Sequence, residues 1–243
     1  MKNTISAVLF AIAIIASSAI LGNAVINRNK KAGTIAVTGL GQSDFTSDLI
    51  VWEASFNRIN HDLQRAYADL ENDKKVIQEY LVSKGIPDSV IVFKAVNTNR
   101  NMKQNYSASG QYIGQEFTGY TLTQSVQIDS KAVEQVEKIS REVTELLNRG
   151  IQLYSMPPRY YYTQLDDLKI EMISRATGNA RIRAEKIASN SGARLGELIT
   201  ARMGIFQITG QNSNEDYSWG GVYNTSSKEK TASITMKLSY EVK

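Results

Sequence analysis

The residues that could take part in chemistry are few in this chain, and the first group is rich in glycine. Gly39-Leu-Gly41-Gln-Ser-Asp44 partly matches the loop that binds dinucleotides, in which backbone N–H groups cradle phosphate. That loop needs a third glycine and a following helix, whereas a strand-like run follows here. The chain also has neither a Walker loop nor a Gly-x-Ser-x-Gly motif. We therefore expect no nucleotide and no other cofactor.

Histidine, cysteine and acidic residues give little support for catalysis or metal binding. His61 is the single histidine, no serine or aspartate lies at a spacing that would complete a triad with it, and cysteine is absent. Asp166-Asp167 and Glu215-Asp216 could bind a hard cation, but neither has the calcium-loop pattern. Asp166-Asp167 more simply begins a helix, where its charge is favourable to the helix dipole. We expect no metal ion and no enzymatic activity.

Aromatic residues cluster in two segments that could contact another molecule. In Tyr160-Tyr161-Tyr162 an extended backbone would place the middle ring opposite the other two. The other cluster lies in a polar, glycine-containing segment over residues 210–229. These rings either fold back over the core or form a protomer contact or a lip that touches a ligand, because aromatic residues are enriched at interfaces. The candidates for this interface or ligand lip are Tyr160, Tyr162, Tyr217, Trp219 and Tyr223.

Length and charge are those of an ordinary globular chain. Its 243 residues suffice for one large domain or two closely packed subdomains, and 42% of them are apolar, as in a folded core. The net charge of +4 arises from 28 bases mixed with 24 acids, which is too weak and too interspersed for a nucleic-acid-binding surface. We therefore expect a folded protein that does not bind nucleic acid.

The N-terminal segment is uncharged from Ile5 to Ile26. As a helix it would span roughly 33 Å, enough for the core of a bilayer. One interpretation is an uncleaved transmembrane anchor, and the other is a secretory signal peptide cleaved after Ala24. The bases Arg28, Lys30 and Lys31 follow the uncharged segment, and by the positive-inside rule they favour a cytoplasmic location for the domain after it. We assign residues 1–32 to this anchor or signal with a basic linker, and residues 33–243 to the folded domain.

Hydrophobic periodicity predicts the elements of that domain. Strands are expected over residues 33–38, 49–57, 90–96, 120–128, 151–165, 198–209 and 231–242. Helices are expected from a cap at Asn60 to Lys84, from Asp129 or Ser130 to Asn148, and from Asp166 to Ser191. The polar residues 97–117 are expected as a long hairpin connection or a partly ordered loop.

This order of elements predicts the fold class. The strands come in hairpin-like pairs between helices, in the order β-β-α-β-β-α-β-α-β-β after an N-terminal hydrophobic helix. Such an arrangement is typical of an α+β fold, with largely antiparallel sheet backed by three helices on one face.

Glycines punctuate the predicted elements. Gly39 and Gly41 suit a turn or bulge that needs positive φ or close backbone approach, Gly85 suits a helix C-terminus, and Gly119 suits the start of a strand. We assign structural roles to Gly39, Gly41, Gly85, Gly119, Gly192 and Gly196.

The layout and its punctuation resemble the SIMPL-domain family, the YggE-like periplasmic proteins that include an oxidative-stress defence protein and a periplasmic immunogenic protein. The resemblance covers Thr34 to Val242. The matching segments are Ile35-Ala-Val-Thr-Gly39-Leu-Gly41 leading to Asp48-Leu-Ile-Val, Lys84-Gly85-Ile86, Thr118-Gly119-Tyr120, and Ala180-Arg-Ile-Arg-Ala184-Glu185-Lys186-Ile-Ala188 running into Gly192-Ala-Arg-Leu195-Gly196.

The resemblance implies a location in the cell envelope, assembly into oligomers that look ring- or channel-like in one member, and a role in stress tolerance. It implies no catalytic residues. We therefore expect a non-enzymatic periplasmic envelope protein that forms homo-oligomers, either attached to the membrane through residues 5–26 or cleaved and soluble. One alternative is a binding module for a small molecule or envelope polymer, using residues 97–117 and 210–229. The other is an unrecognised hydrolase.

Overall fold

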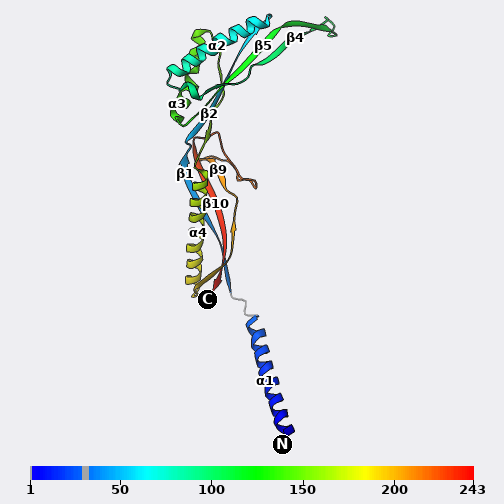
Figure 1. Cartoon of the computed structure of the whole chain (residues 1–243), viewed down its shortest axis with the longest axis vertical. Helices are drawn as coiled ribbons and strands as arrows, with labels where there is room; N and C mark the ends of the chain where they lie inside the picture. Colours follow the sequence, from blue (N-terminus) through cyan, green and yellow to red (C-terminus); the bar gives the residue numbers. More distant parts are fainter. Residues whose placement is uncertain (1, 29–32) are drawn as a thin grey trace. The chain divides into compact units, whose positions relative to one another are not determined.

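The structure is a computed structural model that describes residues 2–28 and 33–243 (Figure 1). It begins with helix α1 (Lys2–Arg28). Of the helices in these two ranges, none combines the length and the apolarity needed to cross a membrane. The expected transmembrane helix over residues 5–26 is therefore not confirmed, and Lys30 and Lys31 of the expected basic linker lie outside the described residues.

Contacts between residues divide the chain into two compact units, which we describe separately. The larger unit comprises Gln42–Met172 and Ile205–Ser233, and the smaller unit comprises Met1–Gly41, Ile173–Gly204 and Ile234–Lys243. Three elements contribute residues to both units: β1 (Thr34–Thr46), α4 (Leu165–Asn190) and β10 (Glu229–Val242). Each unit is therefore built from segments that lie far apart in the sequence.

The larger unit contains a six-stranded sheet in which β2 (Leu49–Asn60) is central. β2 pairs with β5 (Tyr112–Ser130) along most of its length, from Ile50 opposite Ser130 to Asn60 opposite Tyr120. The remaining strands are β3 (Ile91–Phe93), β4 (Asn97–Tyr106), β6 (Tyr154–Ser155) and β7 (Arg159–Tyr161). The pairs in this sheet are antiparallel, as the sequence predicts.

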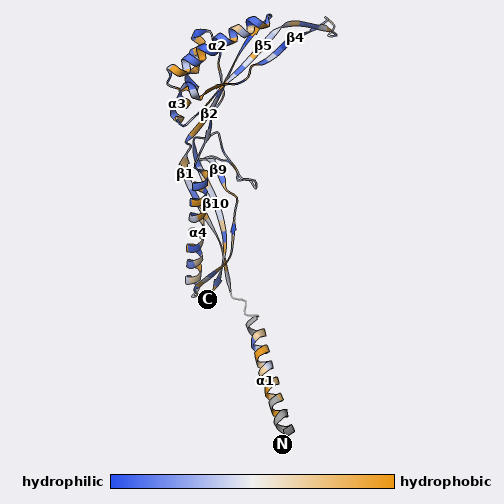
Figure 2. Ribbon diagram, in the orientation of Figure 1, coloured by the Kyte–Doolittle hydropathy of each residue, from blue (hydrophilic) through white to orange (hydrophobic). Residues whose placement is uncertain are grey.

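Helices α2 (Leu63–Ser83) and α3 (Val133–Glu142) pack on β2. Alternate residues of β2, among them Trp52 and Phe56, are fully buried there, whereas their neighbours are only half-buried. Both helices also carry hydrophilic residues (Figure 2), so each is amphipathic and places one face on the sheet. Helices on one face of an antiparallel sheet confirm the predicted α+β class.

Residues 97–117, which were expected as a connection, lie mostly in strands. β4 and the first part of β5 form a long hairpin, from Asn97 opposite Thr123 to Tyr106 opposite Tyr112. Most residues of β4 are exposed on both faces, so the sequence shows no alternation of apolar and polar residues. The hairpin is held by backbone hydrogen bonds rather than by a core, and periodicity could not reveal it.

Three helix boundaries also differ from the prediction. The cap of α3 was expected at Asp129 or Ser130, but β5 continues through both residues and the N-cap is Ala132. The N-cap of α2 is Asp62, whose side chain accepts a hydrogen bond from the N–H of Arg65, and Asn60 instead ends β2. The α-helical geometry of α3 stops at Glu142, and the chain continues as the 3-10 helix η2 (Val143–Arg149). A further short 3-10 helix, η1 (Asp88–Val90), precedes β3.

The strand expected over residues 198–209 is divided into β8 (Leu195–Met203) and β9 (Gln207–Gly210). β9 pairs with β10 in the larger unit, where Ala232 lies opposite Ile208. In the smaller unit β10 lies between β1 and β8 and is antiparallel to β8. β10 is therefore one strand with two different partners along its length.

In the smaller unit, α4 packs on β1 through alanines at every fourth position. These residues are almost completely buried: Ala176, Ala180, Ala184 and Ala188. A Cβ atom added at Gly39 of β1 would lie 2.1 Å from the carbonyl oxygen of Ala176. The segment Gly39–Asp44 was expected to turn, but β1 runs through it as a continuous strand. Gly39 therefore lets the helix backbone approach the strand.

Candidate functional site

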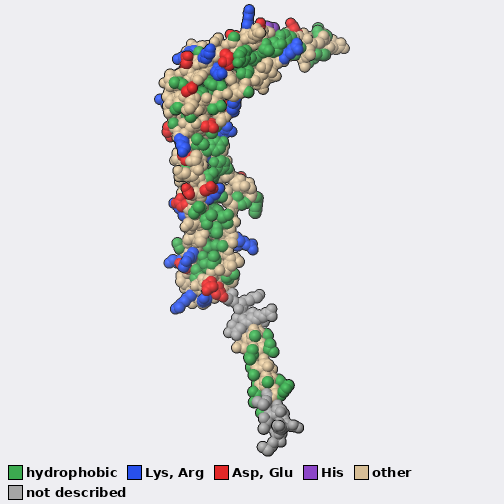
Figure 3. Space-filling model, in the orientation of Figure 1, with side chains coloured by type: hydrophobic (Ala, Val, Ile, Leu, Met, Phe, Trp, Pro, Cys, Tyr) green, Lys and Arg blue, Asp and Glu red, His purple; other side chains and the backbone are tan. Residues whose placement is uncertain are grey.

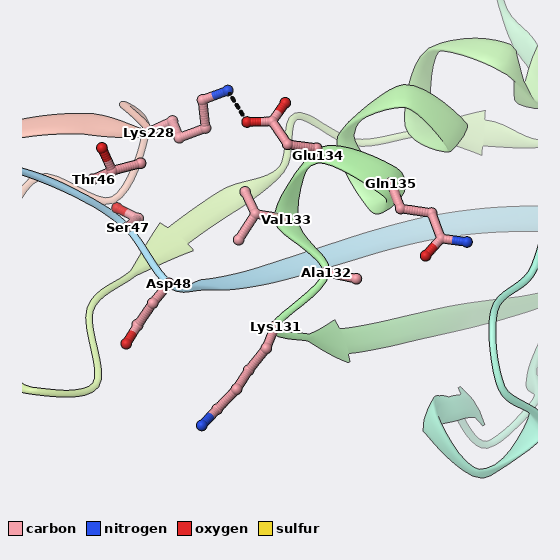
Figure 4. A pocket seen from close by; sticks show the side chains of 9 residues that line it. All are labelled: Thr46, Ser47, Asp48, Lys131, Ala132, Val133, Glu134, Gln135 and Lys228. Carbon is pink, nitrogen blue, oxygen red and sulfur yellow. Dashed lines mark hydrogen bonds and ion pairs between the residues drawn. The ribbon is translucent and has the colours of Figure 1, made fainter.

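A hollow lined by several polar groups lies in the larger unit, where the β1–β2 connection meets the start of α3 (Figure 4). Its volume is about 540 Å³. The lining residues come from three segments: Thr46, Ser47 and Asp48, then Lys131, Ala132, Val133, Glu134 and Gln135, and finally Lys228.

Beneath the pocket, Ser47 is paired with a buried lysine. The Lys230 ammonium donates hydrogen bonds of 2.8 Å to Ser47 Oγ and of 2.8 Å to the carbonyl oxygen of Tyr160. Lys230 is 1% exposed and Ser47 is 4% exposed. Burial lowers the pKa of Lys230 to about 8, although the negative charge of Glu215 opposes this shift. Sequence reasoning missed this pair, because the two residues lie 183 positions apart.

The protonation of Lys230 decides what this pair can do. With a pKa of about 8 the amine is mainly protonated at neutral pH. An ammonium group has three donors and no acceptor, so in this form Lys230 donates to Ser47 Oγ and to the carbonyl oxygen of Tyr160, and it fastens β10 to β7 and to the β1–β2 connection.

Three other charged residues of the pocket, Lys228, Glu134 and Asp48, are paired within the chain. The ammonium of Lys228 lies 2.8 Å from Glu134 (dashed line in Figure 4) and 3.2 Å from Glu137. Burial opposes the ionisation of Glu137, but hydrogen bonds from Arg141 and Lys228 outweigh it and lower the pKa of this carboxyl. The carboxylate of Asp48 accepts hydrogen bonds of 2.7 and 2.6 Å from the N–H and hydroxyl of Thr163.

The aromatic candidates are separated by the structure. Tyr160 is buried, the Tyr162 ring packs 4.7 Å from that of Phe45, and Tyr223 lies 6.4 Å from Tyr161 between ring centroids. Tyr223 is nevertheless 44% exposed, and two rings are more so: Tyr217, 66% exposed with its hydroxyl 3.3 Å from that of Ser233, and Trp219, which is 96% exposed. Tyr217 and Trp219 are therefore the candidates with the most ring surface open to a partner.

The loop that carries these two rings, residues 211–228, is anchored by a buried glutamine of β9. Gln207 donates a hydrogen bond of 2.8 Å to the carbonyl oxygen of Ser218 and accepts one of 2.8 Å from the N–H of Val222. Glu215 accepts a bond of 2.9 Å from the N–H of Gly210 and another from the amide of Asn224. Glu215 therefore stabilises the loop. Apolar side chains lie at the outer end of this loop (Figure 3).

The remaining candidates are in ordinary structural positions. The His61 ring packs edge-on against Phe117, with 5.9 Å between centroids. Asp166 and Asp167 lie in the first turn of α4, where the sequence places them. Among the residues that the structure describes, no cluster of His, Cys, Asp and Glu could hold a metal ion.

Comparison with known proteins gives the family. A family model described as SIMPL, a protein of unknown function (DUF541), matches residues 35–242. The chain belongs to the SIMPL family. A comparison with curated proteins finds no match. The SIMPL match begins at the second residue of β1 and ends with β10, so it spans both units.

The glycines singled out in this SIMPL chain have different geometries. Gly85 has a φ of +89° just beyond the C-cap of α2, and Gly192 has a φ of +72° just after α4. Gly119 does not start a strand: it lies within β5 with a φ of +126°, next to a shift in register with β4. A Cβ at Gly196 would lie 2.9 Å from the carbonyl oxygen of Glu241. Gly41 lies within β1.

Proposed function

We propose that this SIMPL-family protein is a non-enzymatic, self-assembling protein of the cell envelope that supports envelope or oxidative-stress tolerance. The uncharged segment from Ile5 to Ile26 would direct it out of the cytoplasm, as a tether or as a cleaved signal. The non-enzymatic part is supported by the pocket, where Ser47 and Lys230 link strands and the charges of Lys228 and Asp48 are paired within the chain. A broad screen of ester and amide substrates should give no turnover that depends on Ser47.

Self-assembly is carried by one observation: Trp219 is 96% exposed on a loop that Gln207 and Glu215 hold in place. Tryptophan and tyrosine contribute disproportionately to protein interfaces, because a large rigid ring is buried at little entropic cost. A fixed loop that presents Trp219 beside Tyr217 is suited to contact a second protomer.

Light scattering on the purified full-length chain tests this proposal. The wild-type chain should have a mass well above its 27.0 kDa monomer, and replacing Trp219 and Tyr217 with serine should lower that mass. Tyr67→Ser is the matched control, because Tyr67 is also exposed but lies on α2. An unchanged mass in the Trp219→Ser, Tyr217→Ser variant would remove this loop as an interface.

Tryptophan fluorescence gives an independent readout. The chain has two tryptophans, and Trp52 is fully buried in the core of the larger unit. Dilution from oligomer to monomer should therefore make Trp219 accessible to acrylamide while Trp52 stays protected. Quenching that is independent of concentration would contradict burial of Trp219 between protomers.

The location has its own test. The intact mass of protein purified from cells shows whether residues 1–24 remain, and added protease shows whether the domain is accessible in spheroplasts. We expect the domain to be cleaved by protease added outside the inner membrane. Complete protection until lysis would place the domain in the cytoplasm and reject the envelope part of the proposal.

A further inference from the structure

Strand β8 of the smaller unit has one backbone edge that faces away from its partner. Gly204 donates an N–H hydrogen bond of 2.8 Å to the carbonyl oxygen of Thr235 on β10, at the end of the β8–β10 ladder. Hydrogen-bonded pairs alternate in an antiparallel ladder, so Arg202 and Thr200 direct their backbone groups toward β10. The N–H and C=O groups of Ala201 and Met203 therefore point outward.

The side chains of β8 are exposed as well. All residues from 197 to 203 are exposed, on both faces of the strand. Three of them are large and apolar: Leu198, Ile199 and Met203. A long exposed strand edge with apolar side chains is a template for pairing with another strand, and proteins normally protect such edges.

The other edge strands that the structure describes are protected. β3, β6 and β7 are only 3, 2 and 3 residues long. β4 is longer and, like β8, carries two charged residues, but its large exposed apolar side chains are only Met102 and Tyr106, against three on β8. The outer edge of β9 is covered by its own loop, since Ile208 exchanges backbone hydrogen bonds with Val222 and Asn224. On β1, side chains of α4 occupy two backbone groups: Arg183 donates to the carbonyl oxygen of Thr38, and Asn179 accepts from the N–H of Leu40.

We propose that β8 pairs antiparallel with β8 of a second copy of this chain, across a two-fold axis. The proposal rests on the self-assembly put forward above and names one surface that carries it. A second copy fits because it brings an edge with the same length, exposure and outward backbone groups, and because a symmetric pair leaves neither edge open. The sheets of the two smaller units would join into one.

Symmetry restricts the register of such a pair. A two-fold axis perpendicular to the sheet places residues of the same number opposite each other at the axis. With Arg202 at the axis, two guanidinium groups would face each other, which is unfavourable. With Ala201 at the axis, Arg202 faces Thr200 of the second copy, and Met203 meets the bulge at Ile199, where the register of β8 with β10 shifts. We assign the register centred on Ala201, in the regular part of the strand.

A cysteine at the axis tests the pairing directly, because the natural chain has no cysteine. Opposed residues in a hydrogen-bonded antiparallel pair have Cα atoms about 5.5 Å apart, within the range that a disulfide spans. Under mild oxidation, Ala201→Cys should give a covalent dimer in high yield. Ile182→Cys is the control, since Ile182 is 59% exposed on α4 of the same unit and should not cross-link.

A charge on the edge provides the second measurement. Ile199→Lys should lower the mass of the full-length chain in light scattering at least twofold, whereas Ile182→Lys should leave it unchanged. Circular dichroism and thermal melting check that both variants fold. If Ile199→Lys does not fold, the cross-linking of Ala201→Cys still tests the pairing.

The outcomes separate this inference from the proposed function. A wild-type chain that is monomeric at all concentrations would reject both. An oligomeric wild type that Ile199→Lys leaves intact, with no cross-link through Ala201→Cys, would reject pairing through β8 and leave self-assembly standing. A strand of another protein cross-linked to Ala201→Cys in cells, in place of a second copy, would also reject it.

Discussion

The ammonium of Lys230 donates a hydrogen bond of 2.8 Å to the hydroxyl of Ser47, at a point where both residues are shielded from water. Burying the charge lowers the pKa of Lys230 from 10.5 to about 8. Below pH 8 the folded protein carries the full cost of the buried ammonium. Between pH 8 and 10.5 the folded state releases the proton while the unfolded chain keeps it, so stability rises with pH by about 3 kcal/mol.

Lys230→Met isolates this contribution, because methionine keeps an unbranched chain without the charge. From pH 8 to pH 10.5 the unfolding free energy of the wild type should rise relative to that of the variant. Denaturant unfolding at several pH values measures it, and taking the difference cancels the titration of tyrosines. Parallel curves for the two proteins would show that the amine is not desolvated.

Gly39 and Ala176 provide a test of how closely α4 approaches β1. In Gly39→Ala the new Cβ would lie 2.1 Å from the Ala176 carbonyl oxygen and 2.5 Å from the Ala180 nitrogen. Backbone atoms cannot move aside as a flexible side chain can, so we expect a loss of about 3 kcal/mol or more in unfolding free energy.

The matched control for Gly39→Ala is Gly178→Ala. Gly178 lies in α4 with nothing within 4 Å of an added Cβ, and alanine favours helix over glycine by about 1 kcal/mol. Denaturant unfolding should show the two identical substitutions moving stability in opposite directions. A mild effect at Gly39 would mean that the helix and strand lie further apart than described.

The ion pair of Arg58 and Asp73 should behave as a unit. The guanidinium donates a hydrogen bond of 2.7 Å to the buried carboxylate, in addition to the bond from its Nε. Arg58→Met leaves the Asp73 charge buried without its partner, so we expect a loss of about 3 kcal/mol. Adding Asp73→Leu to this variant should restore most of that stability. Additive losses in the double-mutant cycle would contradict coupling between the two residues.

Much of the fold could be predicted because half-buried elements leave a period in the sequence. The alternation of Trp52 and Phe56 with polar neighbours in β2 predicts a strand with one buried face, and the structure has it. The β4–β5 hairpin has no buried face over most of β4, so the same reasoning interpreted it as a connection. Periodicity reports burial, and it is silent where a strand is held by its backbone alone.

The pocket was harder to predict than the fold, because its residues meet only through the tertiary structure. Ser47 follows β1, and Lys230 is the second residue of β10. One signal was present: Lys230 shares its parity with the buried residues Ala232 and Ile234, which places it on the inward face of its strand. A lysine in phase with the buried residues of a strand predicts a buried charge, but not which groups form hydrogen bonds with it.

Gln207 should determine whether the loop over residues 211–228 stays fixed. Its side chain bonds both to Ser218 and to Val222, and Gln207→Ala removes both hydrogen bonds. At about 1 kcal/mol for each bond, we expect the loop to open at least tenfold more often. Limited digestion with chymotrypsin should then cut near Trp219 about tenfold faster, without a comparable change in the melting temperature of the core.

Gln211→Ala is the matched control for this experiment, because Gln211 lies in the same loop but is exposed and contacts Asp44 at 3.2 Å. If Gln207→Ala and Gln211→Ala are cut at the same rate, the buried glutamine is not what holds the loop. If Gln207→Ala alone is cut faster and also has a lower mass in light scattering, loop order is required for assembly. This result is expected, since a ring that must first be ordered binds more weakly than one already held in position.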